Sequence, residues 1–311
     1  AHYLFNLMNV DDEDVDKIKY YEFAPSATTD AIALETAAAR SLQSVVKIDD
    51  FDAIIDESWG KVVGAGRRNA IGVLHSPRHY GQWGIKLYAV SKYHRDYVES
   101  NYGKVDGVLY NAILEELYHK SSDKEDFLLF LSRITPEKGA SVFVKACVEA
   151  RVKCVVAGED GLFAPDQQYV RSVRDYAVRH DIAWLGQVPF DVKVDLMGRA
   201  KAVVVMPQPP YVEVFGMWGL EVMQCGTPII TNLNGGMYEL VGSQSTHEGL
   251  IMGRGAIFTV NPSSSHDLAR AMQLVDSLSK RFSNPIDSRV VTAQYLREVE
   301  KLINGSEGDA Q

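Results

Sequence analysis

Two carboxylates stand eight positions apart in the segment Glu213-Val-Phe-Gly-Met-Trp-Gly-Leu-Glu221. Gly216 and Gly219 interrupt the segment, and the apolar residues after them predict a turn followed by a short helix. This arrangement predicts that both carboxylates face one cleft.

The elements on either side of this segment predict where it lies. Residues 202–206 form a β-branched run typical of a buried strand, and a second apolar run, 228–231, restarts the strand pattern. In an open α/β sheet the loops at the carboxyl ends of the strands line the ligand crevice, so we expect Glu213, Phe215 and Gly216 there. Backbone amides at the helix start, around Gly216 and Met217, offer a site for phosphate.

A second segment, Phe130-Leu-Ser-Arg-Ile-Thr-Pro-Glu-Lys-Gly139, carries two cations. An apolar strand leads to Arg133, Lys138 follows five residues later, and Gly139 opens an amphipathic helix. Arg grips phosphate oxygens in a fork and Lys acts as a mobile point charge, so two cations beside a helix start predict a diphosphate site.

Together these segments resemble the E-x7-E signature of retaining GT-B glycosyltransferases, most closely glycosyltransferase family 4. The resemblance covers residues 127–241 well and residues 71–112 more loosely. It implies an α/β fold of the GT-B type, with two Rossmann-like domains facing each other across a cleft. It also implies that a C-terminal helix returns to the first domain.

The resemblance assigns roles to individual residues. Arg133 and Lys138 would neutralise the leaving diphosphate of a nucleotide sugar, with Phe215, Gly216 and Met217 adding contacts to the donor. Glu213 would hold hydroxyls of the donor sugar as a catalytic residue, and Glu221 would bond the ribose diol. His75, at the end of the strand run 71–74, resembles the family histidine that projects toward the donor sugar, and His79 is a weaker second candidate. No metal and no cofactor besides the nucleotide sugar are implied.

The chain is expected to divide into an N-terminal acceptor-side domain, residues 1–120, a nucleotide-sugar-binding domain, residues 121–285, and a C-terminal helix with a frayed tail, residues 286–311. Strands alternating with helices favour parallel sheets. Relatives usually open with a Gly-rich loop after the first strand, whereas this chain has the acidic run 11–16 near its start. The first domain is therefore expected to be short or incomplete.

Charge is unevenly distributed over the 311 residues, whose formal net charge is −9. Residues 61–95 contain seven Lys or Arg residues and no acid, with aromatic side chains interleaved. Such a segment suits an anionic partner, which predicts a phosphorylated or lipid-linked acceptor, or peripheral contact with a membrane. An ordinary basic face is the alternative. The sequence contains no nucleic-acid-binding motif.

Three cysteines, Cys147, Cys154 and Cys225, lack metal-ligand or C-x-x-C spacing. They predict buried free thiols in a reducing compartment. No apolar run reaches the roughly 20 residues needed to cross a bilayer and no signal-peptide pattern is present. The expected location is the cytoplasm, with membrane contact through residues 61–95 as a peripheral attachment.

These features predict a retaining, metal-independent hexosyltransferase that uses a nucleotide-diphosphate sugar. Two alternatives stay open. The chain could be a related GT-B enzyme, either a nucleotide-sugar epimerase or a sugar phosphorylase. It could also be a non-catalytic subunit that binds a nucleotide sugar.

Overall fold

The structure is a computed structural model that describes residues 3–7, 19–23, 31–77, 82–121, 123–161, 164, 166–232, 234–240, 245–247, 250–253, 255–259, 261–277 and 286–308. Two compact units make up the chain. Unit 1 consists of Ala1–Val90, Arg95–Leu109 and Ala293–Gln311, and unit 2 consists of Ser91–His94 and Tyr110–Thr292. The acidic run 11–16 and His79 lie outside the described residues.

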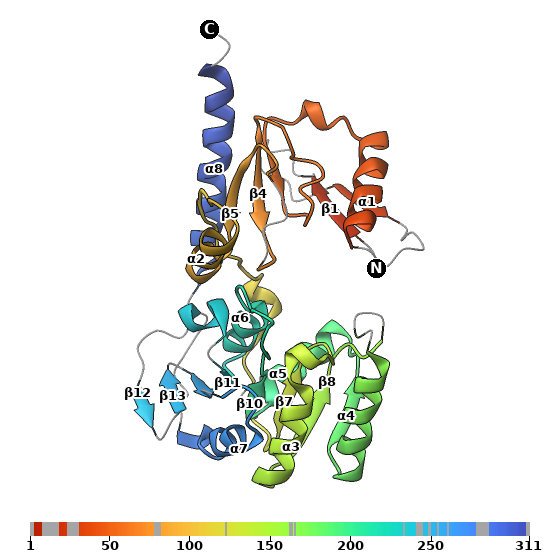
Figure 1. Cartoon of the computed structure of the whole chain (residues 1–311), viewed down its shortest axis with the longest axis vertical. Helices are drawn as coiled ribbons and strands as arrows, with labels where there is room; N and C mark the ends of the chain where they lie inside the picture. The colour runs from red at the N-terminus through yellow and green to blue at the C-terminus, as the bar shows by residue number, and fades with distance from the viewer. Residues whose placement is uncertain are drawn as a thin grey trace. The chain divides into compact units, whose positions relative to one another are not determined.

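Unit 1 contains a parallel four-stranded sheet (Figure 1). In spatial order its strands are β3 (Ile54–Asp56), β4 (Ala70–Leu74), β5 (Lys86–Ala89) and β6 (Gly107–Val108). A separate antiparallel pair joins β1 (Tyr3–Leu7) to β2 (Lys19–Phe23). The sequence did not predict this pairing, in which the element after β1 is a second strand rather than a helix.

Helix α1 (Ala31–Val45) and the part of α2 (Lys92–Asn101) from Arg95 onward accompany the sheet of unit 1, together with the part of α8 (Ser288–Gly308) from Ala293 onward. All residues of β4 are buried, as expected for a central strand of a parallel sheet. The helix α8 contacts β5 through the Tyr88 hydroxyl, which donates to the Glu298 carboxylate at 2.6 Å.

Unit 2 is built on an eight-stranded sheet ordered β12-β13-β14-β11-β10-β7-β8-β9. Its strands are β7 (Leu128–Leu131), β8 (Cys154–Ala157), β9 (Ala183–Gly186), β10 (Ala202–Val204), β11 (Ile229–Asn232), β12 (Ser245–His247), β13 (Leu250–Gly253) and β14 (Ala256–Thr259). Strands β7 to β11 and β14 run parallel, and β12 and β13 are antiparallel additions at one edge. The chain order reverses direction between β7 and β10, which is the switch point where ligands bind in sheets of this kind.

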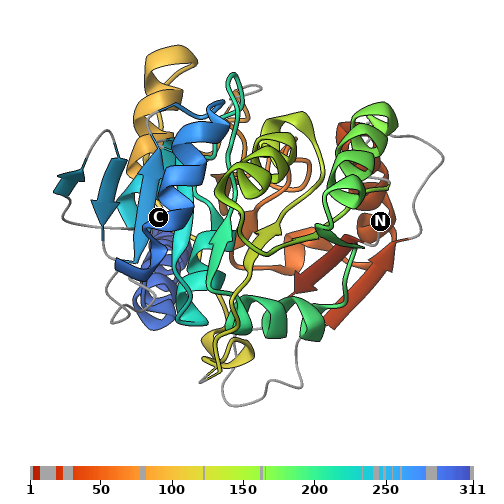
Figure 2. The same cartoon turned by 90° about the horizontal axis from the view of Figure 1, so that it is seen from below.

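Helices cover both faces of this sheet. They are α3 (Ala140–Ala150), α4 (Gln167–Arg179), α5 (Phe190–Arg199), α6 (Met217–Gln224) and α7 (Ser265–Gln273), with 3-10 turns η3 (Glu115–Leu117), η4 (Pro136–Lys138), η5 (Gly235–Leu240) and η6 (Val275–Ser277). Figure 2 shows α3, α4 and α7 on one side of the sheet and α5 on the other. Side chains of α3, α4 and α7 pack with the strands into one core that includes Phe130, Phe143 and Leu268.

Candidate functional site

A lysine and a glutamate form a buried ion pair in unit 2. The Lys138 Nζ atom lies 2.7 Å from Glu213 Oε2, and the two residues are only 7% and 9% exposed. The ammonium also donates to the Tyr211 hydroxyl at 2.8 Å and lies 4.2 Å from the centre of its ring. That hydroxyl in turn donates to Glu213 Oε1 at 3.4 Å, so the three side chains contact one another.

The charges of this cluster stabilise one another. Burial acts to lower the pKa of Lys138, but the neighbouring Glu213 carboxylate and the Tyr211 hydroxyl outweigh it and raise that pKa. Burial raises the pKa of Tyr211 and the Glu213 charge adds to the effect, whereas Lys138 and Arg133 oppose it. At neutral pH the cluster therefore holds a charged lysine and a neutral tyrosine.

The strand β7 and the turn after it position Lys138. Residues 128–131 of β7 are buried, and the chain then forms η4, which ends at Lys138. Gly139 follows with a left-handed φ of 77° and begins α3. A Cβ atom there would lie 2.2 Å from the Met206 carbonyl oxygen, so only glycine allows this close approach of the turn to the end of β10.

A loop from the neighbouring strand β11 holds the backbone around Glu213. The Asn234 side chain accepts from the Glu213 amide and donates to the Tyr211 carbonyl, both at 2.8 Å. The Gly236 amide donates to the Glu213 carbonyl at 2.9 Å. Gly235 has a φ of 72°, and a Cβ atom there would lie 1.9 Å from the same carbonyl oxygen. The position of the carboxylate thus depends on two loops that meet at the switch point.

Arg133 lies on the same loop as Lys138 but is more exposed. Its side chain is 44% exposed and its guanidinium lies 3.9 Å from Glu137. Because its charge acts on the pKa of Tyr211, Arg133 is close enough to the cluster to add positive charge there.

Glu221 has a cation of its own. On α6, its carboxylate lies 2.7 Å from Lys193 Nζ of α5 and accepts from the Tyr118 hydroxyl at 2.9 Å. The Tyr118 ring meets Phe190, at the start of α5, edge-on with centroids 5.7 Å apart. The two carboxylates of the E-x7-E segment therefore pair with different lysines, Lys138 and Lys193.

Between the two carboxylates, Phe215, Gly216 and Met217 form the turn into α6. Phe215 is 2% exposed, and its ring centroid lies 6.2 Å from that of Tyr110, so its side chain belongs to the core. Gly216 has a φ of 86°, and Met217 is the first residue of α6. Of this turn, the backbone is the part that suits a role as hydrogen-bond donor.

His75 lies in unit 1, directly after β4, with its Nε2 atom 3.8 Å from Glu57 Oε2. Burial raises the pKa of Glu57. The charge of Lys61 opposes this rise, and the charge of Asp56 adds to it. The histidine thus lies beside charged residues at the carboxyl end of the sheet of unit 1. Its contact with a donor sugar stays a prediction.

Among the described residues of the segment 61–95, the basic side chains differ in exposure: Arg68, Lys86 and Lys92 are exposed, whereas Lys61 is buried. Lys61 is 1% exposed and its ammonium donates to the Ser58 carbonyl. Tyr88 is also buried, Arg67 pairs with Asp49, and Arg95 pairs with Asp96. The acids that neutralise Arg67 and Arg95 were either distant in sequence or just beyond the segment.

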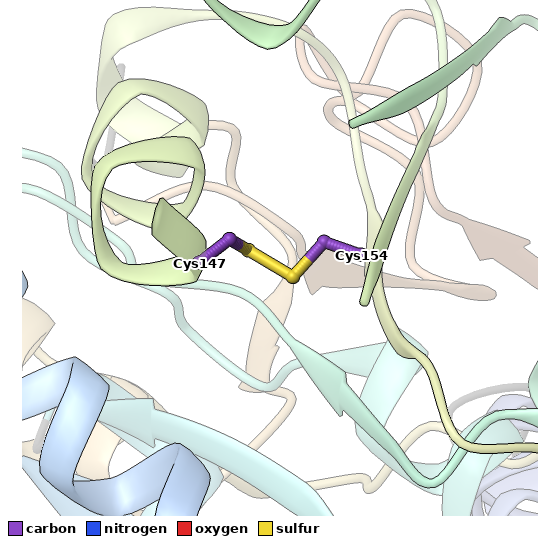
Figure 3. Close-up of a disulfide and its surroundings, with 2 residues drawn as sticks. All are labelled: Cys147 and Cys154. Carbon is purple, nitrogen blue, oxygen red and sulfur yellow. A yellow bond between two sulfur atoms is a disulfide. The ribbon is translucent and has the colours of Figure 1, made fainter. Parts of the chain in front are cut away.

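The prediction of three free thiols was wrong for two of them. Cys147 of α3 and Cys154 of β8 form a disulfide, with Cα atoms 6.3 Å apart (Figure 3). Arg151 ends α3 in a left-handed conformation and turns the chain back, which brings residues seven positions apart face to face. Spacing rules for metal or redox motifs do not detect such a turn. Cys225 is a buried free cysteine, as predicted.

Sequence reasoning missed Tyr211, Asn234 and Lys193 as members of these clusters. A signal existed for Tyr211, because residues two apart in an extended segment share a side and Glu213 follows at that spacing. Asn234 could have been found as a polar residue in the loop after the next parallel strand. For Lys193 no local pattern exists, since its pairing depends on how α5 packs beside α6.

Within the ranges that the structure covers, no helix has the length and apolar character required to span a membrane. Over the same ranges, no group of three or more His, Cys, Asp or Glu residues is placed to bind a metal ion.

Comparison with known proteins identifies the family. The model of the family described as "Glycosyl transferases group 1" matches residues 117–284, more than half of the chain. An uncharacterized glycosyltransferase of Methanocaldococcus jannaschii is 26% identical over 159 residues, which cover 50% of this chain and 42% of the relative. The gpi3 subunit of phosphatidylinositol N-acetylglucosaminyltransferase from Schizosaccharomyces pombe is 25% identical over 206 residues, covering 63% of this chain and 40% of the relative. The match thus spans less than half the length of these curated relatives.

Solved structures share the fold. Anabaena HepE in complex with UDP and glucose matches with a TM-score of 0.66 at 20% identity, over 89% of this chain and 84% of that one. AviGT4, a glycosyltransferase involved in avilamycin A biosynthesis, matches with a TM-score of 0.62 at 20% identity, over 87% and 79% of the two chains. The fold is α/β, of the GT-B type with two Rossmann-like domains, as predicted. The chain belongs to the glycosyl transferases group 1 family.

Proposed function

We propose that this protein is a retaining glycosyltransferase of family 4 that transfers a sugar from a nucleotide-diphosphate sugar to a hydroxyl acceptor. The observation that carries the proposal is the buried pair of Lys138 and Glu213 at the switch point, with Arg133 on the same loop. A cation and a carboxylate together suit a ligand that has an anionic diphosphate and a hydroxyl-bearing sugar. HepE, which shares the fold, was solved with UDP and glucose.

In this proposal the residues act at successive parts of the donor. Arg133 and Lys138 neutralise the charge that grows on the diphosphate as the glycosidic bond breaks. Glu213 accepts hydrogen bonds from hydroxyls of the donor sugar, and backbone amides at Gly216 and Met217 support the phosphate. Glu221 bonds the ribose diol, and His75 keeps its predicted role as a contact to the donor sugar. Side chains, not a metal ion, balance the diphosphate, so activity should persist when divalent metal is removed with excess EDTA.

The proposed acceptor is anionic and sugar- or lipid-linked. Relatives include proteins named D-inositol 3-phosphate glycosyltransferase, from Mycobacterium species, and the gpi3 subunit named for phosphatidylinositol. Those names point to phosphorylated, inositol-containing acceptors. Exposed Lys and Arg residues between positions 61 and 95 are the proposed contacts for such an acceptor or for an anionic membrane. Donor turnover measured with inositol phosphates tests a free phosphorylated acceptor, and the same measurement with phosphatidylinositol vesicles tests a lipid-linked one.

The decisive experiment compares the parent protein with Glu213→Gln. A thermal-shift screen of nucleoside diphosphates and their sugars first identifies the donor, since a ligand at 100 times its Kd stabilises by about 2.7 kcal/mol. On that donor, Glu213→Gln should lower kcat by roughly 10² to 10³, as expected for loss of one preorganised electrostatic group. Glu221→Gln should instead raise the donor KM, because its ribose contacts exist before and during reaction. A Glu213→Gln protein with parental kcat would overturn the assignment.

A further inference from the structure

The Lys138–Glu213 pair raises a question about donor binding. Without ligand, the ammonium and the carboxylate satisfy each other at 2.7 Å in a buried setting. In the proposed function the ammonium must turn toward the diphosphate. That movement would leave the Glu213 carboxylate buried without its cation, and an uncompensated buried charge is strongly unfavourable.

Tyr211 is the group placed to compensate for this change. Its hydroxyl accepts from Lys138 Nζ at 2.8 Å and lies 3.4 Å from Glu213 Oε1, so it already contacts both charges. A phenol hydroxyl is both donor and acceptor, and rotation about one bond decides where its proton points. The contact of the hydroxyl with Lys138 is short and its contact with Glu213 is long. This arrangement is expected while Lys138 remains paired with Glu213.

The backbone of Tyr211 is held so that only side-chain atoms need to move. Its amide donates to the Gln208 carbonyl at 3.0 Å, and its carbonyl accepts from Asn234 Nδ2 at 2.8 Å. Asn234 also accepts from the Glu213 amide, which fixes the spacing between Tyr211 and Glu213. The Tyr211 ring lies 4.2 Å from the ammonium and limits how far Lys138 can move.

We propose that Tyr211 is a positioning residue that exchanges partners when the donor binds. In the free protein its hydroxyl accepts from Lys138, and when Lys138 turns to the diphosphate the same hydroxyl donates fully to Glu213. The Tyr211 hydroxyl thus takes the place of the ammonium as the hydrogen-bond donor to Glu213, whose carboxylate stays available to the sugar. The inference rests on the proposed function, because it requires that a diphosphate binds beside Lys138. Arg133, whose guanidinium lies 3.9 Å from Glu137, is a further charged group that acts on Tyr211.

Proton uptake on nucleotide binding distinguishes this role from simple packing. Calorimetry with UDP and GDP, in two buffers of different ionisation enthalpy at about pH 7.5, counts the protons bound with each nucleotide. In Tyr211→Phe the ring remains but the Glu213 carboxylate loses its substitute donor, so a proton taken up from solvent should compensate for the buried charge when Lys138 turns away. We expect up to one extra proton taken up per nucleotide and a Kd about tenfold weaker, the loss typical of one hydrogen bond to a charged group.

Two further variants assign the proton and control for the loss of a phenol. The double variant Tyr211→Phe with Glu213→Gln should take up no extra proton, because the group that accepts it is gone. Tyr88→Phe removes a similar phenol–carboxylate contact, that of Glu298 in unit 1, and should bind nucleotide like the parent. With a donor sugar, Tyr211→Phe should raise KM more than it lowers kcat.

The outcomes separate the two proposals. If the parent binds neither nucleotide, the donor site is wrong and the role of Tyr211 falls with it. If the parent binds and Tyr211→Phe matches its affinity and proton count, the exchange is wrong while the donor site stands. Weaker binding with the parental proton count would also overturn the exchange and reduce Tyr211 to a packing residue.

Discussion

The side chains of Lys138 and Glu213 illustrate why a buried ion pair indicates function more than stability. Desolvation of two charges offsets much of their attraction, so such a pair contributes little compared with an apolar pair of the same size. Removing one member is costly because it leaves the other charge buried. Under the proposed function, a pair of this kind at a switch point is retained for donor binding rather than for stability.

The raised pKa of Lys138 predicts how stability depends on pH. Its ordinary value is 10.5 and folding raises it, so the stabilisation from its charge is fully present below about pH 10.5 and is lost as the pH rises through the higher folded-state value. Urea unfolding of the parent and of Lys138→Met, from about pH 9 to about pH 12, should show a steeper loss of stability in the parent. Parallel curves for the two proteins would contradict the raised pKa.

The sequence indicated charged residues that lie together in unit 2 but not all of their partners. Glu213, Lys138 and Arg133 follow buried strands in a recognisable order, so their placement at one sheet edge could be inferred. The ion pair of Glu221 with Lys193 could not, because Lys193 lies in a helix whose docking angle no local pattern encodes. The sequence predicted that both carboxylates face one cleft, Glu213 at the donor sugar and Glu221 at the ribose. In the structure each pairs with its own lysine, and the two ligand roles stay predictions.

At the scale of elements, the loop between β11 and η5 controls the position of Glu213. Gly235→Ala should destabilise the protein and weaken nucleotide binding, because its Cβ would lie 1.9 Å from a backbone oxygen that cannot move independently. Gly66→Ala is the matched control: its φ of 75° is close to the 72° of Gly235, yet nothing lies within 4 Å of the added Cβ. The control should lose only the cost of a left-handed alanine, about 1–2 kcal/mol.

Urea unfolding and UDP titration of both variants separate the steric clash from the cost of a left-handed alanine. The difference between Gly235→Ala and Gly66→Ala measures the steric clash alone. Equal losses of stability, with nucleotide binding unchanged in both, would contradict the role of the loop in holding Glu213.

The disulfide between α3 and β8 predicts how the three cysteines react with a thiol reagent. Burial raises the pKa of the Cys225 thiol to about 11, and Cys147 and Cys154 are bonded. Iodoacetamide should therefore label no cysteine in the native protein, one after unfolding, and three after unfolding with reductant. Labelling of all three in unfolded protein without reductant would disprove the disulfide.

The same bond should contribute to stability. It closes a short loop, for which the chain-entropy model gives about 2–3 kcal/mol. Cys147→Ser with Cys154→Ser should lower the unfolding free energy by about that amount. Nucleotide binding should be unaffected, since the half-cystines line a pocket with residues at the amino ends of the strands, including Lys153 and Ile182.

At the scale of the whole molecule, unit 1 is assembled from segments far apart in the chain. Residues from Ala293 onward belong to it, and Leu302 is 9% exposed there. Deleting everything after Thr292 should therefore loosen the sheet of β3 to β6 while leaving unit 2 folded. Hydrogen exchange measured by mass spectrometry should show faster exchange in residues 54–108 and parental protection in residues 128–259.

A uniform rise in exchange across both units would contradict this division. Retained binding of UDP by the truncated protein would add that the nucleotide contacts lie within unit 2. The Tyr88–Glu298 contact links residues 210 positions apart, so no local sequence pattern could predict it. Family resemblance was therefore the basis for predicting that the C-terminal helix joins the first domain.

The alternation of strands and helices was enough to predict the fold class and the parallel sheets. Buried runs such as those of β7 and β10 are continuous and β-branched or leucine-rich, which is typical of strands covered on both faces. The antiparallel pair β1–β2 was not predicted, because its second strand, Lys19-Tyr-Tyr-Glu-Phe23, lacks a clear apolar alternation.

The terminal position of β9 in the sheet has a consequence for self-association. An outermost strand offers unpaired amides and carbonyls to any other chain, and β9 also carries Leu185, which is 47% exposed. The strand is only four residues long, and its pairing with β8 shifts register between Val156 and Ala157. A short, irregular border of this kind is a poor template for cross-β growth, so substitutions that lengthen or straighten β9 would be expected to promote aggregation.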